Sequence, residues 1–186
     1  MANSNTAAIN VSVPAGIVPG ELLVLVISGR DNLPGLPNGW TNIGTSNNGA
    51  NIYNRTCYKF ATASESAVII ADSGVYTAGR MFLFTNVDAT NPINAFSTNT
   101  SDGTSFSATG VTTTADGCMV VHAVTFQDGG TAADTNNYSS PPSNANLSGL
   151  SKISDNYFYG GSAGVNGGIY LVTGLKATAG TTGNTT

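Results

Sequence analysis

The sequence predicts an all-β fold, an antiparallel β-sandwich of the jelly-roll-like kind, and three observations carry this prediction. Gly, Thr, Asn and Ser account for 86 of the 186 residues. Thr favours strands and Gly and Asn favour turns, whereas helices expose Glu, Lys, Gln and Arg. Short apolar runs alternate with Gly- and Asn-containing turns, and two pairs of segments repeat weakly. The length fits a single domain over residues 1–186.

The strands follow from hydropathy patterns. Apolar and polar residues alternate over 9–13, which predicts a half-buried strand that stops at Pro14. The segment 21–28 is apolar at nearly every position, as in a central strand covered on both faces. The same logic places 119–124 in the interior of a sheet. Further strands are expected at 41–45, 52–60, 67–71, 79–87, 105–112, 118–126, 150–153 and 168–175.

The internal repeat divides the chain into halves of about 8–95 and 105–180. Residues 19–26 (PGELLVLV) align with 115–122 (ADGCMVVH), and 58–63 (YKFATA) align with 174–179 (GLKATA). In the first half, two more expected strands follow the second repeated segment. In the second half only seven residues follow Ala179. By comparison with its first half, the sandwich is therefore about two strands short.

Charge excludes two classes of partner. The net charge is −4 with only six basic residues, too few to neutralise a run of phosphates or to bind an anionic membrane surface. The longest apolar run, 22–27, is far shorter than a membrane-spanning segment. Residues 1–6 carry no basic residue and no apolar stretch of the secretory type, so we expect synthesis in a cytoplasm.

Candidate catalytic and metal-binding residues are few, and we expect no enzyme activity, no metal and no cofactor. The single histidine, His122, lies mid-strand among apolar residues and is expected to be structural. The two cysteines, Cys57 and Cys118, lack metal-binding spacing and are expected to remain unbonded. Asp128 and Asp134 could offer oxygen ligands to calcium, but they match a plain turn better. No pair of acidic residues has the support of a glycosidase motif.

Aromatic residues offer the only candidate contact surface. Tyrosines near Asn and Gly in expected loops suit recognition of sugars or proteins, although packing at the rims of the sandwich explains them better. Those singled out as surface-contact residues are Tyr138, Tyr157 and Tyr159; Tyr53 and Tyr76 belong to the same group. Trp40, the only tryptophan, heads an expected strand and is assigned to the core.

Four stretches in order resemble a β-sandwich domain found in tailed-phage virion proteins and in some bacterial surface proteins. They are 18–26 (VPGELLVLV), 36–41 (LPNGWT), 58–65 (YKFATASE) and 86–93 (NVDATNPI). The resemblance covers about residues 8–180, and its motifs are turns and strand starts that carry no catalytic residue. Members of that family end with one or two further strands, which have no counterpart in this sequence.

The resemblance implies a non-enzymatic virion surface protein, a capsid decoration or head-fibre protein. The alternative is a carbohydrate-binding adhesin module of a tail fibre or bacterial surface protein, which would bind host glycans; a hydrolase has the least support. Because an incomplete sheet leaves an unpaired edge, we expect another chain to complete it by strand addition. That chain would belong to a homotrimer or to a neighbouring major capsid or fibre protein. The alternative is that the sequence is part of a longer chain whose own last strands complete the sheet.

Overall fold

The computed structural model describes residues 1–49, 51–102, 105–128, 140–158 and 166–186. Those residues form antiparallel strands and no helix, which confirms the all-β prediction. The first sheet has five strands in the order β1-β7-β3-β5-β4. Their bounds are β1 Ala2–Ser4, β3 Leu22–Gly29, β4 Thr41–Asn48, β5 Ile52–Phe60 and β7 Thr77–Phe84.

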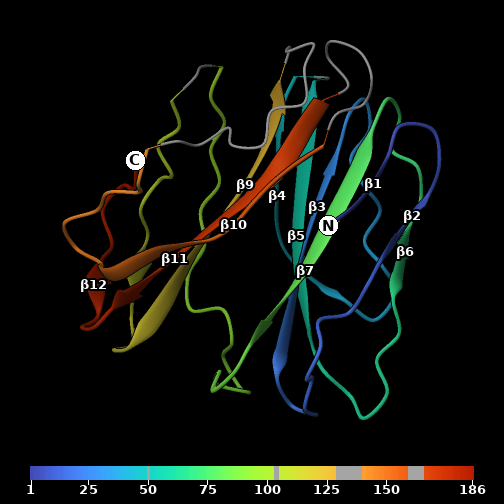
Figure 1. Ribbon diagram of the computed structural model, residues 1–186. Helices are drawn as coiled ribbons and strands as arrows, with labels where there is room; N and C mark the ends of the chain where they lie inside the picture. Colours follow the sequence, from blue (N-terminus) through green and yellow to red (C-terminus); the bar gives the residue numbers. More distant parts are fainter. Residues whose placement is uncertain (50, 103–104, 129–139, 159–165) are drawn as a thin grey trace.

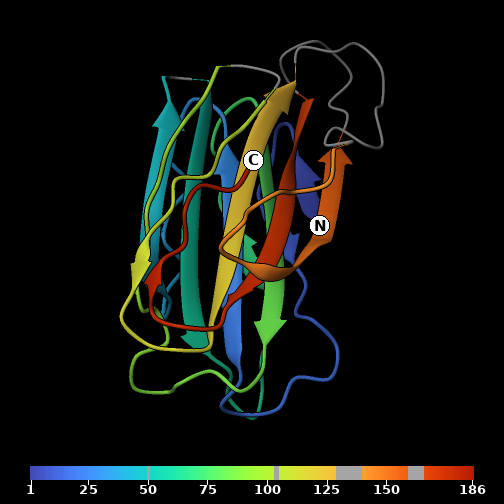
Figure 2. The ribbon, with the colours of Figure 1, turned by 90° about the vertical axis from the view of Figure 1, so that its left-hand side faces the viewer.

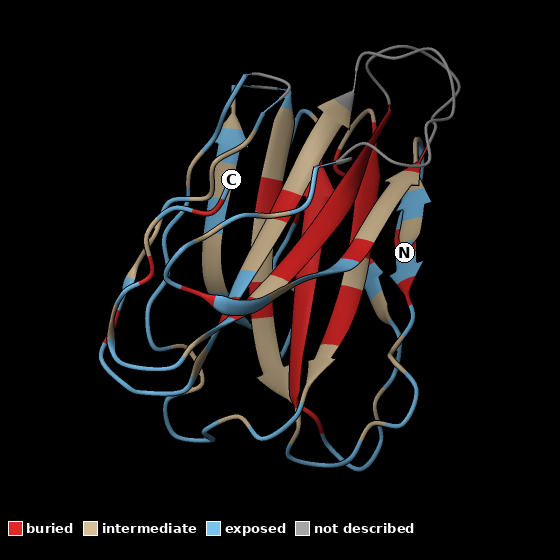
Figure 3. Ribbon diagram, turned by 60° about the vertical axis from the view of Figure 1, so that its left-hand side comes forward, coloured by how far each residue is buried: buried red, intermediate tan, exposed pale blue. Residues whose placement is uncertain are grey.

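The centre of the first sheet is β3, every residue of which is buried (Figure 3). On one face, Leu23, Leu25 and Ile27 form a core with Cys57 and Trp40, so Trp40 is a core residue as predicted. A two-stranded sheet of β2 (Ile9–Val11) and β6 (Val68–Ile70) covers this face. β2 lies close to β7, because a Cβ added at Gly79 of β7 would lie 2.7 Å from the side chain of Val11.

The second sheet packs on the opposite face of the first (Figures 1 and 2). Its order is β10-β11-β9, with β9 at Cys118–Asp128, β10 at Ser148–Phe158 and β11 at Asn166–Lys176. Ile169 and Leu171 of β11 meet Val26 and Phe82 between the sheets. Fully buried Tyr76 joins this core, with its ring edge-on to Phe158 at 5.0 Å and its hydroxyl 3.4 Å from Ser28 Oγ.

The prediction that 119–124 lies wholly inside the fold is wrong for one end of β9. Val120 and Val124 are buried, but the side chain of Met119 is 60% exposed and that of Val121 is 36% exposed. Alternate residues share a face, and Ala123 packs between the sheets, so Met119 and Val121 also point toward the first sheet. Figure 1 shows why they remain open: the ends of β9 and β11 at these residues diverge from the first sheet.

The C-terminal tail is an ordered part of the fold. The expected strand at 105–112 is wrong in extent, because only β8 (Thr112–Thr113) and an isolated bridge from Ala108 to Thr185 form there. β8 pairs with β12 (Gly180–Thr181), and the main chains of Thr186 and Ser143 exchange two hydrogen bonds. Phe106 packs with Val124, Tyr170 and Val172 on the outer face of the second sheet.

Candidate functional site

The tyrosines singled out from the sequence divide between the described part of the chain and the remainder. Tyr138 and Tyr159 lie outside the described residues, as does Asp134. Tyr157 stacks on Phe126, with ring centroids 6.4 Å apart and planes 16° from parallel. Both rings flank Gly168, where a Cβ would come within 2.5 Å of the Phe126 ring. Tyr157 therefore takes part in rim packing, the alternative that the sequence left open.

His122 has a structural environment within β9. It points to the outer face of the second sheet, where its Nε2 lies 2.8 Å from Thr185 Oγ1 of the tail. Burial lowers the pKa of the imidazole, so the neutral form is favoured in the folded protein. No carboxylate contacts the ring among the interactions that the structure describes, so the arrangement lacks the orienting acid of a hydrolytic triad.

The thiols and acidic side chains of the described residues form neither a disulfide nor a metal-binding group. Cys57 and Cys118 are free thiols, and burial raises the pKa of Cys57 to about 12. No group of three His, Cys, Asp or Glu side chains suited to a metal ion occurs among the described residues.

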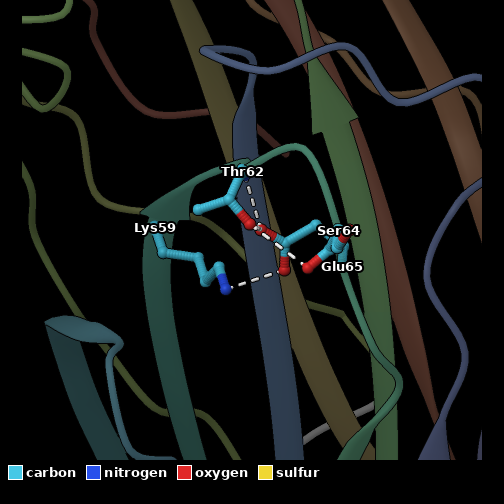
Figure 4. Close-up of polar contacts among 4 residues, drawn as sticks. All are labelled: Lys59, Thr62, Ser64 and Glu65. Atoms are coloured by element: carbon cyan, nitrogen blue, oxygen red, sulfur yellow. Dashed lines mark hydrogen bonds and ion pairs between the residues drawn. The ribbon is translucent and has the colours of Figure 1, made fainter.

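The third resembling stretch, 58–65, ends in a turn held by Glu65 (Figure 4). Glu65 accepts a 2.6 Å hydrogen bond from the Thr62 amide and one of 2.9 Å from its hydroxyl, and lies 2.7 Å from Lys59 Nζ. Desolvation opposes ionisation of the carboxyl, but these hydrogen bonds outweigh it and lower the pKa of Glu65. This motif therefore builds a turn and carries no chemistry.

An exposed apolar group lies at one end of β9; we call it the β9 patch and define it as Met119, Val121 and Leu175. Met119 and Leu175 are directly opposite in the β9–β11 ladder, and Leu175 is 44% exposed. Val121 lies two residues along the same face. Three apolar side chains thus sit together on a sheet face that nothing in the described part of the chain covers.

β9 is also an edge strand. Among the described residues its only ladder partner is β11. The repeat makes this edge informative, because the segment aligned with 118–122 is 22–26 in β3, which has β5 on one side and β7 on the other. The segment aligned with the end of β5 forms the end of β11. In the first sheet β3 thus has a second neighbour, β7, whereas β9 has none besides β11 among the described residues.

The other end of β9 borders a polar cleft of about 340 Å³, which we call the β9 cleft. Its floor is the face of β4 and β5 that carries Ser46, Asn48 and Asn54. One wall is β9 from Ala123 to Gln127, and the other comes from residues 99–102 and 105–106. The cleft lies between the second sheet and the segment that follows β7.

Hydrogen bonds link the floor of the β9 cleft to both walls. Asn54 Nδ2 donates to Thr125 Oγ1 at 3.3 Å, and Thr56 Oγ1 donates to Asn54 Oδ1 at 3.1 Å. Across the cleft, Asn48 Nδ2 donates to Asp102 Oδ1. No motif marks these residues in the sequence, because Asp-Gly is a common turn pair and asparagine is frequent throughout the chain.

Comparisons with family models, with curated proteins and with solved structures find no match. No helix long and apolar enough to cross a membrane occurs among the described residues.

Proposed function

We propose that this chain is a non-enzymatic structural protein of a virion surface, a capsid decoration or head-fibre protein, that joins its neighbours through the free edge of β9. The observation that carries the proposal is the β9 patch on an edge strand. Apolar side chains and unpaired main-chain groups at one place are the ingredients of strand addition by another chain.

The chemistry of this edge supports an assembly role. Proteins that remain monomeric protect their edge strands with charged residues, proline or a covering segment. Cys118 to Thr125 contains no charged residue at neutral pH and no proline, and the neutral form of His122 is the favoured one. A partner strand beside β9 would occupy the position that β7 has beside β3.

The resemblance to tailed-phage virion domains supports the location. Its motifs 18–26 and 58–65 contribute the first part of β3, the end of β5 and the turn after β5. These segments build the first sheet, and none of the four resembling stretches includes β9.

Sedimentation of the purified chain at micromolar concentration tests the proposal. We expect a defined oligomer, with three copies as the first expectation, and we expect Val121→Lys to dissociate it. The matched control is Ile69→Lys, which replaces another exposed apolar residue on β6, away from β9. A stable, non-aggregating wild-type monomer contradicts the self-association. Immunolabelling of intact particles then tests the virion location.

A carbohydrate-binding module remains the second candidate function. The specific observation in its favour is the β9 cleft, whose lining is polar and nearly uncharged.

A further inference from the structure

The β9 cleft has the chemistry of a small-molecule site that the assembly role does not use. It lies at the Ala123–Gln127 end of β9, whereas the β9 patch lies near the opposite end of the strand. Its volume of about 340 Å³ falls within the ~300–1,000 Å³ range of small-molecule sites. The two features can therefore be altered separately.

The lining selects the class of ligand. The described residues that line it carry amide and hydroxyl groups, one carboxylate and some apolar side chains, and none of them is Lys, Arg or His. An anionic ligand would find no cation to pair with. The one carboxylate, Asp102, accepts a hydrogen bond from Asn48 and is a single acidic group in an otherwise neutral lining.

Amides and hydroxyls suit a ligand that is neutral and carries many hydroxyl groups. Each amide offers both donors and acceptors, so it can bond a hydroxyl group in either direction. Asn54 is fixed on the floor by its bonds to Thr56 and Thr125, which reduces the entropy that ordering it would cost on binding. Phe106 of one wall and Phe126 of the other add apolar surface to the cleft, against which the C–H face of a sugar ring could pack.

From this lining we infer that the β9 cleft is a binding site for a neutral saccharide, held by Asn48, Asn54 and Asp102. The inference is independent of the proposed virion role. A glycan site would suit a virion surface protein and a bacterial surface protein alike.

Titration of the isotope-labelled full chain followed by NMR tests the inference. The probes are glucose, galactose, N-acetylglucosamine and their β-linked disaccharides, each at about 10 mM, ten times a dissociation constant of ~1 mM. We expect shifts confined to the side-chain amides of Asn48 and Asn54 and to the main chain near Thr125. Absence of shifts with every probe, or shifts spread over the surface, overturns the inference. Preference for a disaccharide over its monosaccharides indicates an extended cell-surface glycan, and equal binding indicates a free sugar.

Variants separate this site from the assembly edge. Asn48→Ala and Asp102→Ala should each weaken binding at least about tenfold, because each removes hydrogen-bonding groups from the cleft. The matched control is Asn10→Ala, which removes an exposed amide on β2 and should leave binding unchanged. Val121→Lys should keep saccharide binding while it dissociates the oligomer. Retained binding in both cleft variants overturns the assignment of the site, whatever the oligomeric state.

Discussion

Nε2 of His122 and Oγ1 of Thr185 lie 2.8 Å apart, so a hydrogen bond ties the middle of β9 to the end of the tail. The tail is also held by main-chain pairing with residues 108–113 and Ser143 and by side-chain hydrogen bonds that involve Asn144, Thr182 and Asn184. The imidazole adds a direct side-chain link from β9 to this network.

His122 should make the protein less stable in mild acid. Burial lowers its pKa in the folded state, so the unfolded chain takes up a proton first as the pH falls below about 6.5. The free energy of unfolding should then decrease by at most about 1.4 kcal/mol per pH unit from this residue. Urea unfolding at several pH values should show that the free energy of unfolding depends less steeply on pH for His122→Gln than for the wild type.

The matched control for this effect is Thr185→Val, which removes the hydrogen-bond partner and keeps the titrating group. It should retain the pH slope at a lower overall stability. Neither variant should change oligomer formation or saccharide binding, because His122 contacts neither the β9 patch nor the β9 cleft. A loss of either activity with the fold intact would contradict the structural role of His122.

A carboxylate should be tolerated at one apolar strand position and not at another. Leu25 is 0% exposed at the centre of the first sheet, and an unpaired charge there costs several kcal/mol on top of the lost burial. Leu25→Asp should therefore prevent folding, as seen by circular dichroism. Val121→Asp should fold, because that side chain is 36% exposed. Unfolding of both variants would mean that a partner or another segment buries Val121.

The two thiols should differ sharply in reactivity. Cys57 is fully buried, and burial raises its pKa to about 12, whereas Cys118 is partly exposed at the start of β9. Because the thiolate is the reactive form, a thiol reagent should label Cys118 in the native protein and Cys57 only after unfolding. Mass spectrometry of the labelled protein identifies the site, and Cys118→Ser should abolish native labelling. Rapid labelling of Cys57 in that variant would contradict the described core.

The Glu65 turn should stabilise the protein above the range in which a carboxylate titrates. Hydrogen bonds from Lys59 and Thr62 lower the folded pKa of Glu65, so its contribution is present above about pH 4.3 and is lost as the pH falls through the folded pKa. Glu65→Gln should cost about 1 kcal/mol near neutral pH and less in acid. The companion variant is Lys59→Gln, which removes the cation. Equal losses of unfolding free energy for Glu65→Gln at neutral and at acidic pH would contradict the ionic contribution of Glu65 to the turn.

Local patterns in the sequence predicted the first sheet better than the second. The apolar run of β3 and the alternation over 9–13 are local signals, and both gave strands, although β2 ends at Val11 and not at Pro14. The run 118–124 looks equally apolar, yet Met119 and Val121 are exposed because the second sheet diverges from the first, which only tertiary structure decides.

The tail and the cleft escaped prediction for a different reason. Residues 178–186 carry no large side chain, and main-chain and polar side-chain hydrogen bonds hold them, which leave no hydropathy signal. The cleft brings Asn48 to Asp102 and Asn54 to Thr125, pairs separated by more than fifty residues. Contacts over such distances follow from topology rather than from local composition.

Because β1 pairs with β7, the first sheet can be completed during synthesis only after β7 has left the ribosome. Every strand of the first sheet has been synthesised once Phe84 has emerged, so that sheet can form early, together with its cover of β2 and β6. Val26 and Phe82 on its other face stay bare until β9 and β11 arrive, a delay of about 5–20 s at ~5–20 residues per second. During that interval the nascent chain exposes one apolar face of the first sheet. Neighbouring ribosomes that make this protein would bring such faces into contact.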